Sequence, residues 1–210
     1  TIGVERSVGS RPEMSHYALR SFLSTRWLFD YDNSDGKEQK SDNFEANGST
    51  KMPGWTYWDT QNGFRIYEND YYVPMGFTYD QYILRSEYDN LSDSQRERTL
   101  LKAIVLEDET ADSQRSTLTH FDTSTGVYTE SAYFEDCLAR RQTTASSFTR
   151  DNGGFSAAIH LEKENLVFFS VPYEGGWTAT VNGEPAEIIQ ANVGFMAVAC
   201  PAGDVEIRFD

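Results

Sequence analysis

The sequence predicts a β-rich α+β protein, in which a small helical and aromatic N-terminal portion packs on a C-terminal antiparallel β-sandwich of jelly-roll type. Two observations favour this class. From residue 166 onward, short apolar segments alternate with turn residues, a pattern typical of antiparallel strands. Apolar residues at helical spacing lie mainly before residue 110. We therefore expect two portions, residues 1–109 and residues 110–210.

The N-terminal portion opens with residues 1–12, which have no periodic pattern and are expected to form a flexible leader. From Pro12 the spacing predicts a helix. Its apolar residues are Met14, Tyr17, Ala18, Phe22 and Leu23. Residues 27–29 continue as a strand or a helix end. Residues 30–50 are rich in Asp, Asn, Ser and Gly, so we expect a loop there.

A dense block of aromatic residues occupies residues 55–88, and within it Phe64–Tyr67 alternates like a half-buried strand. Ser92 and Gln95 then fit a capping box, in which paired side chains satisfy free backbone amides at the start of a helix. The apolar residues that follow form one stripe. We therefore predict a helix over residues 92–106.

The second portion is predicted to contain one further helix and a series of strands. The spacing at residues 131–141 indicates a helix. Residues 148–150 and 155–161 have the pattern of two strands, because residues 151–154 are turn formers. Apolar and small polar residues alternate in the second of these, as expected for a sheet with one solvent-exposed face.

The end of the chain is predicted to be a run of short strands. Asn182–Gly183 between two of them is a strong hairpin signal, because both residues accept positive φ. Trp177 follows Gly176 and is expected to pack between sheets. The predicted strands are residues 166–171, 177–181, 186–190, 194–199 and 204–209.

Charge and length limit the classes of function. The chain has 210 residues and a formal net charge of −15. Such a field repels nucleic acids and anionic bilayer surfaces, so neither is an expected partner, whereas uncharged sugars remain open. No segment approaches the ~20 apolar residues that span a bilayer. Because the chain opens abruptly and its last strand runs to Asp210, we expect a piece of a longer polypeptide.

Metal, cofactor and nucleophile chemistry have little support. His16, His120 and His160 are far apart and lack zinc-site spacing, so no metal and no cofactor are expected. There is no nucleophile elbow and no phosphate-binding loop, so no catalytic residue is assigned. Cys137 and Cys200 leave two alternatives open, one disulfide bridge or two free buried thiols.

One acidic segment superficially resembles a calcium-binding loop. It contains Asp30, Asp32, Asn33 and Asp35. Ser41 stands where such a loop needs its closing glutamate, and for this reason we expect a solvated acidic loop.

Aromatic side chains in residues 55–59 are the candidates for ligand contact. If this segment is a strand, Trp55 and Tyr57 share one face and Trp58 lies on the other. Rings next to Asp59 suit a sugar, because rings stack on its C–H face while polar groups bond its hydroxyls. The alternative is that the same rings fill the core or an interface with a membrane portion.

Two parts of the chain carry a resemblance to a known family. The C-terminal part consists of Ser170–Tyr173, Gly176–Trp177, Asn182–Gly183 and Pro201–Gly203. Upstream, residues 64–80 are similar to a family segment that runs from Tyr-Glu-Asn to Pro-Met-Gly-Phe. On these residues the chain resembles, over roughly residues 15–210, the extracytoplasmic part of the YfhO-type bacterial membrane proteins.

The resemblance implies an extracytoplasmic domain, on the outer face of the cell membrane, of a polytopic protein similar to glycosyltransferases that use polyprenyl-phosphate sugars. In such families the catalytic acidic residue lies in a loop between transmembrane helices, so none is assigned to these positions. The implied role is accessory or glycan-facing. The implied partners are the transmembrane portion of its own parent chain and an envelope glycan or polymer.

Two other functions stay open. One is a secreted carbohydrate-binding β-sandwich module, which predicts a signal peptide and no long hydrophobic segments on either side. The other is a non-catalytic structural interaction domain. That alternative predicts an exposed apolar patch where the membrane portion docks.

Overall fold

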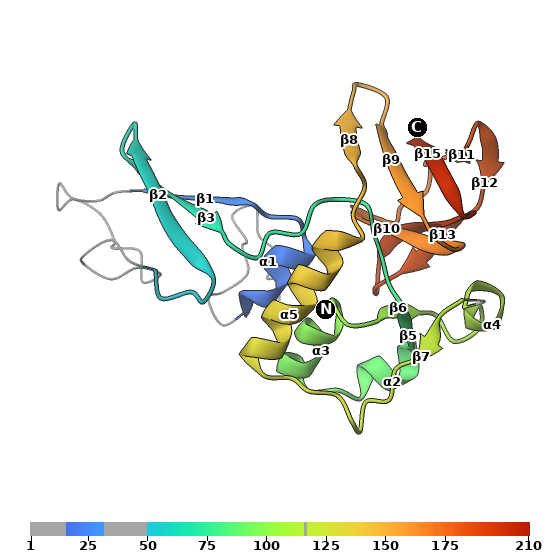
Figure 1. The fold of residues 1–210 in the computed structure, drawn as a ribbon, viewed down its shortest axis with the longest axis horizontal. Coiled ribbons are helices and arrows are strands. Elements are labelled where there is room, and N and C mark those ends of the chain that lie inside the picture. Colours follow the sequence, from blue (N-terminus) through green and yellow to red (C-terminus); the bar gives the residue numbers. More distant parts are fainter. Residues whose placement is uncertain (1–15, 32–49, 116) are drawn as a thin grey trace. The chain divides into compact units, whose positions relative to one another are not determined.

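The computed structural model describes residues 16–31, 50–115 and 117–210. The chain divides into two compact units, Thr1–Val73 and Pro74–Asp210 (Figure 1). Three sheets and several short helices confirm a β-rich α+β fold. The boundary predicted between residues 109 and 110 stays a prediction, as do the sandwich and jelly-roll arrangements.

Some predictions fall on residues outside the described ones. They are the leader at residues 1–12, the helix start at residues 12–15, most of the loop at residues 30–50, and the calcium-like positions Asp32, Asn33, Asp35 and Ser41.

Within residues 16–31 and 50–73, the first unit contains one helix and one antiparallel sheet of order β1-β3-β2. Its elements are α1 (Ala18–Phe22), β1 (Trp27–Tyr31), β2 (Trp55–Gln61) and β3 (Phe64–Asn69). Asn62 and Gly63 connect β2 to β3 with φ values of 51° and 78°. This Asn–Gly geometry matches the twist of a two-residue hairpin. The strand predicted at Phe64–Tyr67 is confirmed.

The second unit contains two sheets. The seven-stranded sheet has the order β4-β10-β14-β13-β6-β5-β7, and the five-stranded sheet has the order β12-β11-β15-β9-β8. β5 runs parallel to β6 and β7, and the other pairs are antiparallel. The elements are β4 (Phe77–Thr78), β5 (Gln81–Leu84), α2 (Arg85–Asp89), α3 (Asp93–Thr99), β6 (Ile104–Leu106), α4 (Ala111–Gln114), β7 (Thr119–His120), α5 (Glu130–Gln142), β8 (Ser147–Arg150), β9 (Phe155–Leu161), β10 (Asn165–Pro172), β11 (Ala179–Val181), β12 (Glu184–Ala186), β13 (Ile188–Ala191), β14 (Phe195–Cys200) and β15 (Gly203–Phe209).

Most predicted elements of this unit are confirmed. α5 covers the predicted helix at residues 131–141, and the side chain of Thr129 accepts a hydrogen bond from the Ala132 amide at its start. β8 and β9 form the predicted hairpin. Asn182 and Gly183 turn the chain from β11 into β12 at φ values of 53° and 82°.

The helix predicted over residues 92–106 is wrong in its second half. The capping interaction is present, since the Ser92 amide donates to the Gln95 side chain at 3.1 Å. α3 nevertheless ends at Thr99, and residues 104–106 form β6. These three residues are buried and pair with β5, a parallel partner from another part of the chain. Long-range pairing thus overrides a local helical pattern.

The strand predicted over residues 186–190 is divided between the two sheets. β12 ends at Ala186 in the five-stranded sheet, and β13 begins at Ile188 in the seven-stranded sheet. The chain therefore changes sheet within two residues, which alternation alone does not signal.

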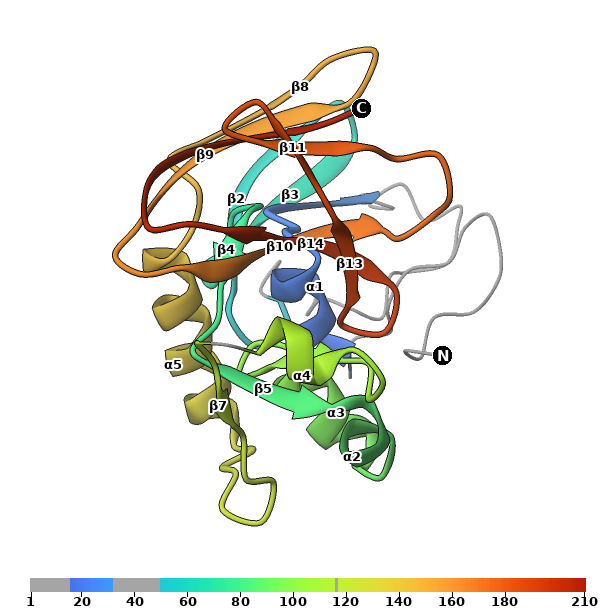
Figure 2. The same cartoon turned by 90° about the vertical axis from the view of Figure 1, so that its right-hand side faces the viewer.

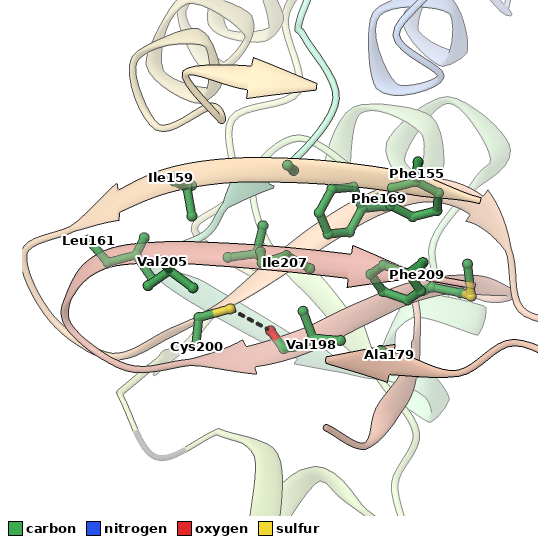
Figure 3. Packing of buried hydrophobic residues seen from close by; sticks show 13 residues of the cluster. Phe155, Ile159, Leu161, Phe169, Ala179, Val198, Cys200, Val205, Ile207 and Phe209 are labelled. Carbon is green, nitrogen blue, oxygen red and sulfur yellow. Dashed lines mark hydrogen bonds between the residues drawn. The ribbon is translucent and has the colours of Figure 1, made fainter. Parts of the chain in front are cut away.

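The main core lies where the two sheets of the second unit face each other. Alternate residues of β9 and β15 meet residues of β10 and β14 in one buried cluster (Figure 3). Figure 2 shows β8, β9 and β11 above β10 and β14 in the same arrangement. Cys137 and Cys200 are buried thiols that form no disulfide, so the second of the two alternatives is confirmed. Burial raises the pKa of the Cys200 thiol to about 12.

Trp177 packs at the margin of this core. Its ring contacts Phe155 and Phe209 with ring centroids 5.8 and 6.4 Å apart. Trp177 is half-buried and packs against the end of the core. The prediction that it packs against the sheets is therefore confirmed in part, since its ring is not fully enclosed between them.

Candidate functional site

The sheet of the first unit has one face on which aromatic residues gather. Residues opposite each other on antiparallel strands point to the same side, and Trp27 and Phe29 of β1 pair with Glu68 and Ile66 of β3. We call the set of Trp27, Phe29, Trp58, Phe64 and Ile66 the aromatic face. Relative exposure is 56% for Phe29, 54% for Trp58 and 38% for Phe64, whereas Ile66 is buried.

A β-bulge in β2 lies at Trp58 and brings Asp59 to the aromatic face beside it. The register between β2 and β3 shifts between Tyr57 and Asp59, so Trp58 is the extra residue. Bulges re-aim side chains in this way. The Trp58 ring contacts Trp27 edge to face, with centroids 5.2 Å apart. Trp27 therefore supports one side of the Trp58 ring, and about half of that side chain stays open to solvent.

Polar groups lie next to this ring. Asp59 pairs with Ile66, which places its side chain on the aromatic face. Its two carboxylate oxygens accept hydrogen bonds of 2.7 Å from the Thr60 amide and the Gln61 side chain. An exposed indole is thus combined with a fixed carboxylate and an amide, which together offer a stacking surface and hydrogen-bonding groups.

An arginine borders the same side. The Arg26 guanidinium lies 5.1 Å from the centroid of the Trp27 ring and donates to Glu68 at 2.9 and 3.0 Å. Because Arg26 and Glu68 are partly exposed, this ion pair contributes little to stability. It fixes the orientation of the guanidinium beside the ring.

The opposite face of the sheet carries the other two predicted contact residues. Trp55 is 5% exposed and packs with Leu28, Met52 and Tyr67. Burial raises the pKa of the Tyr67 phenol. Tyr57 is 47% exposed, and its ring lies 5.9 Å from that of Tyr67. The division of Trp55 and Tyr57 from Trp58 is therefore confirmed, and the glycan role of all four residues stays a prediction.

Among the described residues, two histidines form pairs with carboxylates and not larger catalytic or metal-binding clusters. His120 lies 2.8 Å from a Glu87 carboxylate oxygen, and His160 lies 2.6 Å from one of Asp204. The Asp204 carboxylate raises the pKa of His160. Over residues 16–31, 50–115 and 117–210, no group of three His, Cys, Asp or Glu side chains is arranged to hold a metal ion. Within the same residues, no helix is long and apolar enough to cross a membrane.

The fold and this surface define a β-rich α+β protein with an exposed aromatic sheet face. Residues 133–210 match the family model described as bacterial membrane protein YfhO. They comprise most of α5 and all strands from β8 to β15, so the chain carries the YfhO sequence pattern in its C-terminal part. The resemblance at residues 64–80 lies outside the matched residues. No curated protein and no solved structure matches the chain.

Trp27, Phe29 and Phe64 were missed as candidates from the sequence. A signal was present, because Trp27-Leu28-Phe29 alternates and Asn62–Gly63 marks a hairpin. These signals place Trp27 and Phe29 on one face of a strand and pair β2 with β3, but nothing local indicates that β1 pairs with β3.

Proposed function

We propose that this chain is the part of a bacterial membrane protein that lies outside the cytoplasm, and that its aromatic face contacts a glycan of the cell envelope. The YfhO match supports attachment to a membrane protein. The longer membrane protein is proposed to be a glycosyltransferase, because the chain resembles proteins similar to those that use polyprenyl-phosphate sugars. In this proposal the chain has an accessory role, and catalysis belongs to loops between transmembrane helices.

The observation that carries the glycan contact is the exposed Trp58 ring with the Asp59 carboxylate and the Gln61 amide on the same side. A sugar ring has an apolar C–H face and polar hydroxyl edges, so it needs both kinds of group. An uncharged glycan also escapes the repulsion of a chain with a net charge of −15.

The test compares two neighbouring residues on opposite faces of β2. Neutral oligosaccharides prepared from bacterial envelopes are titrated into the wild-type chain and into Trp58→Ala and Tyr57→Ala, with binding measured by calorimetry. We expect Trp58→Ala to weaken binding about tenfold or more, a loss of ~1.4 kcal/mol. Tyr57→Ala should bind like the wild type.

Thermal unfolding of both variants controls for loss of the fold. Equal affinity of Trp58→Ala and the wild type would remove the aromatic face as the glycan site. Loss of binding only in Tyr57→Ala would move the site to the opposite face, where Trp55 and Tyr57 lie.

A second candidate function is docking to the transmembrane portion of the parent chain. The observation in its favour is that Phe29 and Phe64, both apolar and partly exposed, share the aromatic face. Exposed apolar patches often mark interaction sites. Phe29→Ser should then weaken association of this chain with the membrane portion. An unchanged association would exclude docking through this face.

A further inference from the structure

The second unit contains an open cavity of about 510 Å³, distant in sequence from the aromatic face. This volume is within the range of small-molecule sites. The residues around it come from α4 and the segment after it, the start of β10, the β11–β12 hairpin, β13 and the end of β14. Several parts of one folded unit thus enclose the same space.

The floor of the cavity is apolar. Leu166 and Ile189 line it and are buried, as is Cys200, whose side chain belongs to the core between the sheets, and Val181 and Ala199 line it as well. An apolar floor of this kind binds hydrocarbon, because removing apolar surface from water is favourable.

The charged groups around this floor all have one sign. Glu164, Glu184 and Glu187 line the cavity, and no lysine or arginine among the described residues does. The uncharged groups at the side of α4 are Ser113, Gln114 and Thr117, and the Thr117 hydroxyl donates to the Glu164 carbonyl at 2.9 Å. Carboxylates at a low-dielectric wall focus a negative potential into the space between them.

We propose that this cavity binds a small organic cation that has an apolar body, such as an alkylammonium group. The apolar floor accommodates the hydrocarbon, and the carboxylates of Glu184 and Glu187 face the positive charge. An anion would be repelled. A neutral sugar would find no aromatic ring among the described lining residues, so this site differs in chemistry from the aromatic face.

The first experiment titrates hexylammonium chloride into the full 210-residue chain and uses hexanol as the uncharged control ligand. Saturation-transfer NMR measures the affinities. We expect hexylammonium to bind and hexanol to bind at least about tenfold more weakly. The double variant Glu184→Gln/Glu187→Gln should weaken hexylammonium binding about tenfold and leave hexanol binding unchanged.

The matched control is Glu109→Gln/Glu174→Gln, which removes the same charge from exposed positions outside the cavity. It should bind hexylammonium as the wild type does. If both double variants lose affinity equally, the net charge of the chain attracts the cation and the cavity does not. Equal affinity for hexanol and hexylammonium would also overturn the proposal.

A second measurement locates the ligand independently of charge. Ala199 lines the cavity from an exposed strand position, so Ala199→Trp should fill the space and abolish hexylammonium binding. Retained binding in a folded Ala199→Trp variant would contradict this site.

Discussion

At the scale of single residues, the least expected conformation belongs to Val193. It lies in the turn between β13 and β14 with φ of 75°. β-Branched residues rarely adopt this left-handed region, because Cβ approaches the following carbonyl. The turn is held by buried Asn192, whose side-chain oxygen accepts from the Val105 amide at 2.8 Å and whose amide group donates to the Tyr79 hydroxyl at 3.0 Å.

Replacing Val193 by glycine should therefore stabilise the protein. Relief of strain of ~1–2 kcal/mol outweighs the entropy cost of a glycine, ~0.5–1 kcal/mol, so a net gain of about 0.5–1 kcal/mol is expected. Urea denaturation measures it. Val127→Gly is the control, because Val127 is exposed and has no positive φ. A loss of stability in Val193→Gly as large as that in Val127→Gly would show that the turn is unstrained.

Asn192→Ala should be strongly destabilising. The change leaves the Val105 amide without its buried acceptor and removes one partner of the Tyr79 hydroxyl. Each unsatisfied buried group costs about 1–3 kcal/mol, so a total loss of ~2–4 kcal/mol is expected from urea denaturation. Asn90→Ala, at an exposed helix end, should cost less than ~1 kcal/mol. Similar losses in the two variants would argue against the buried network.

At the scale of elements, the β8–β9 hairpin shows how a turn is fixed by charge and close approach. Asp151 accepts from the amides of Gly153 and Gly154 at 2.8 and 2.9 Å and from Arg208 of β15. These donors hold the pKa of Asp151 well below its usual range. A Cβ on Gly154 would lie 1.9 Å from the Phe209 carbonyl oxygen, so only glycine fits there.

The Asp151 carboxylate makes the hairpin sensitive to acid. Because its folded pKa is lowered, its contribution to stability is fully present above the unfolded pKa of ~3.9 and is lost as the pH falls toward the folded value. Asp151→Asn should be less stable than the wild type at pH 7, and the difference should shrink below pH ~3.5. Denaturant titrations of the two proteins at pH 7 and at a pH below ~3.5 measure the difference in their free energies of unfolding. A difference independent of pH would mean that the charge of Asp151 is irrelevant.

At the scale of the whole molecule, the sequence predicted local features well and long-range ones poorly. The Asn182–Gly183 turn, α5 and the β8–β9 hairpin depend on neighbouring residues, and all three were correct. β6 was predicted as helix because its parallel partner β5 lies about twenty residues earlier and leaves no local trace. Long-range pairing also decides where the chain changes sheet, between Ala186 and Ile188.

The candidate site was also predictable only where it depends on neighbouring residues. Alternation in residues 55–58 placed Trp58 on the face opposite Trp55 and Tyr57, as the structure shows. The burial of Trp55 depends on Leu28, Met52 and Tyr67, which approach it only in the folded sheet. No local signal marks the bulge at Trp58 or the contact with Trp27.

The central claim is that this chain is the outward-facing part of a membrane protein, and its most direct test is surface labelling of the native product in intact bacteria. An amine reagent that cannot cross the membrane is applied, and the product is recovered with an antibody against this chain after a carbonate wash. We predict that the product resists the wash, needs detergent for release and is labelled within residues 50–210 before lysis. Release by carbonate, or labelling of these residues only after lysis, would contradict the claim.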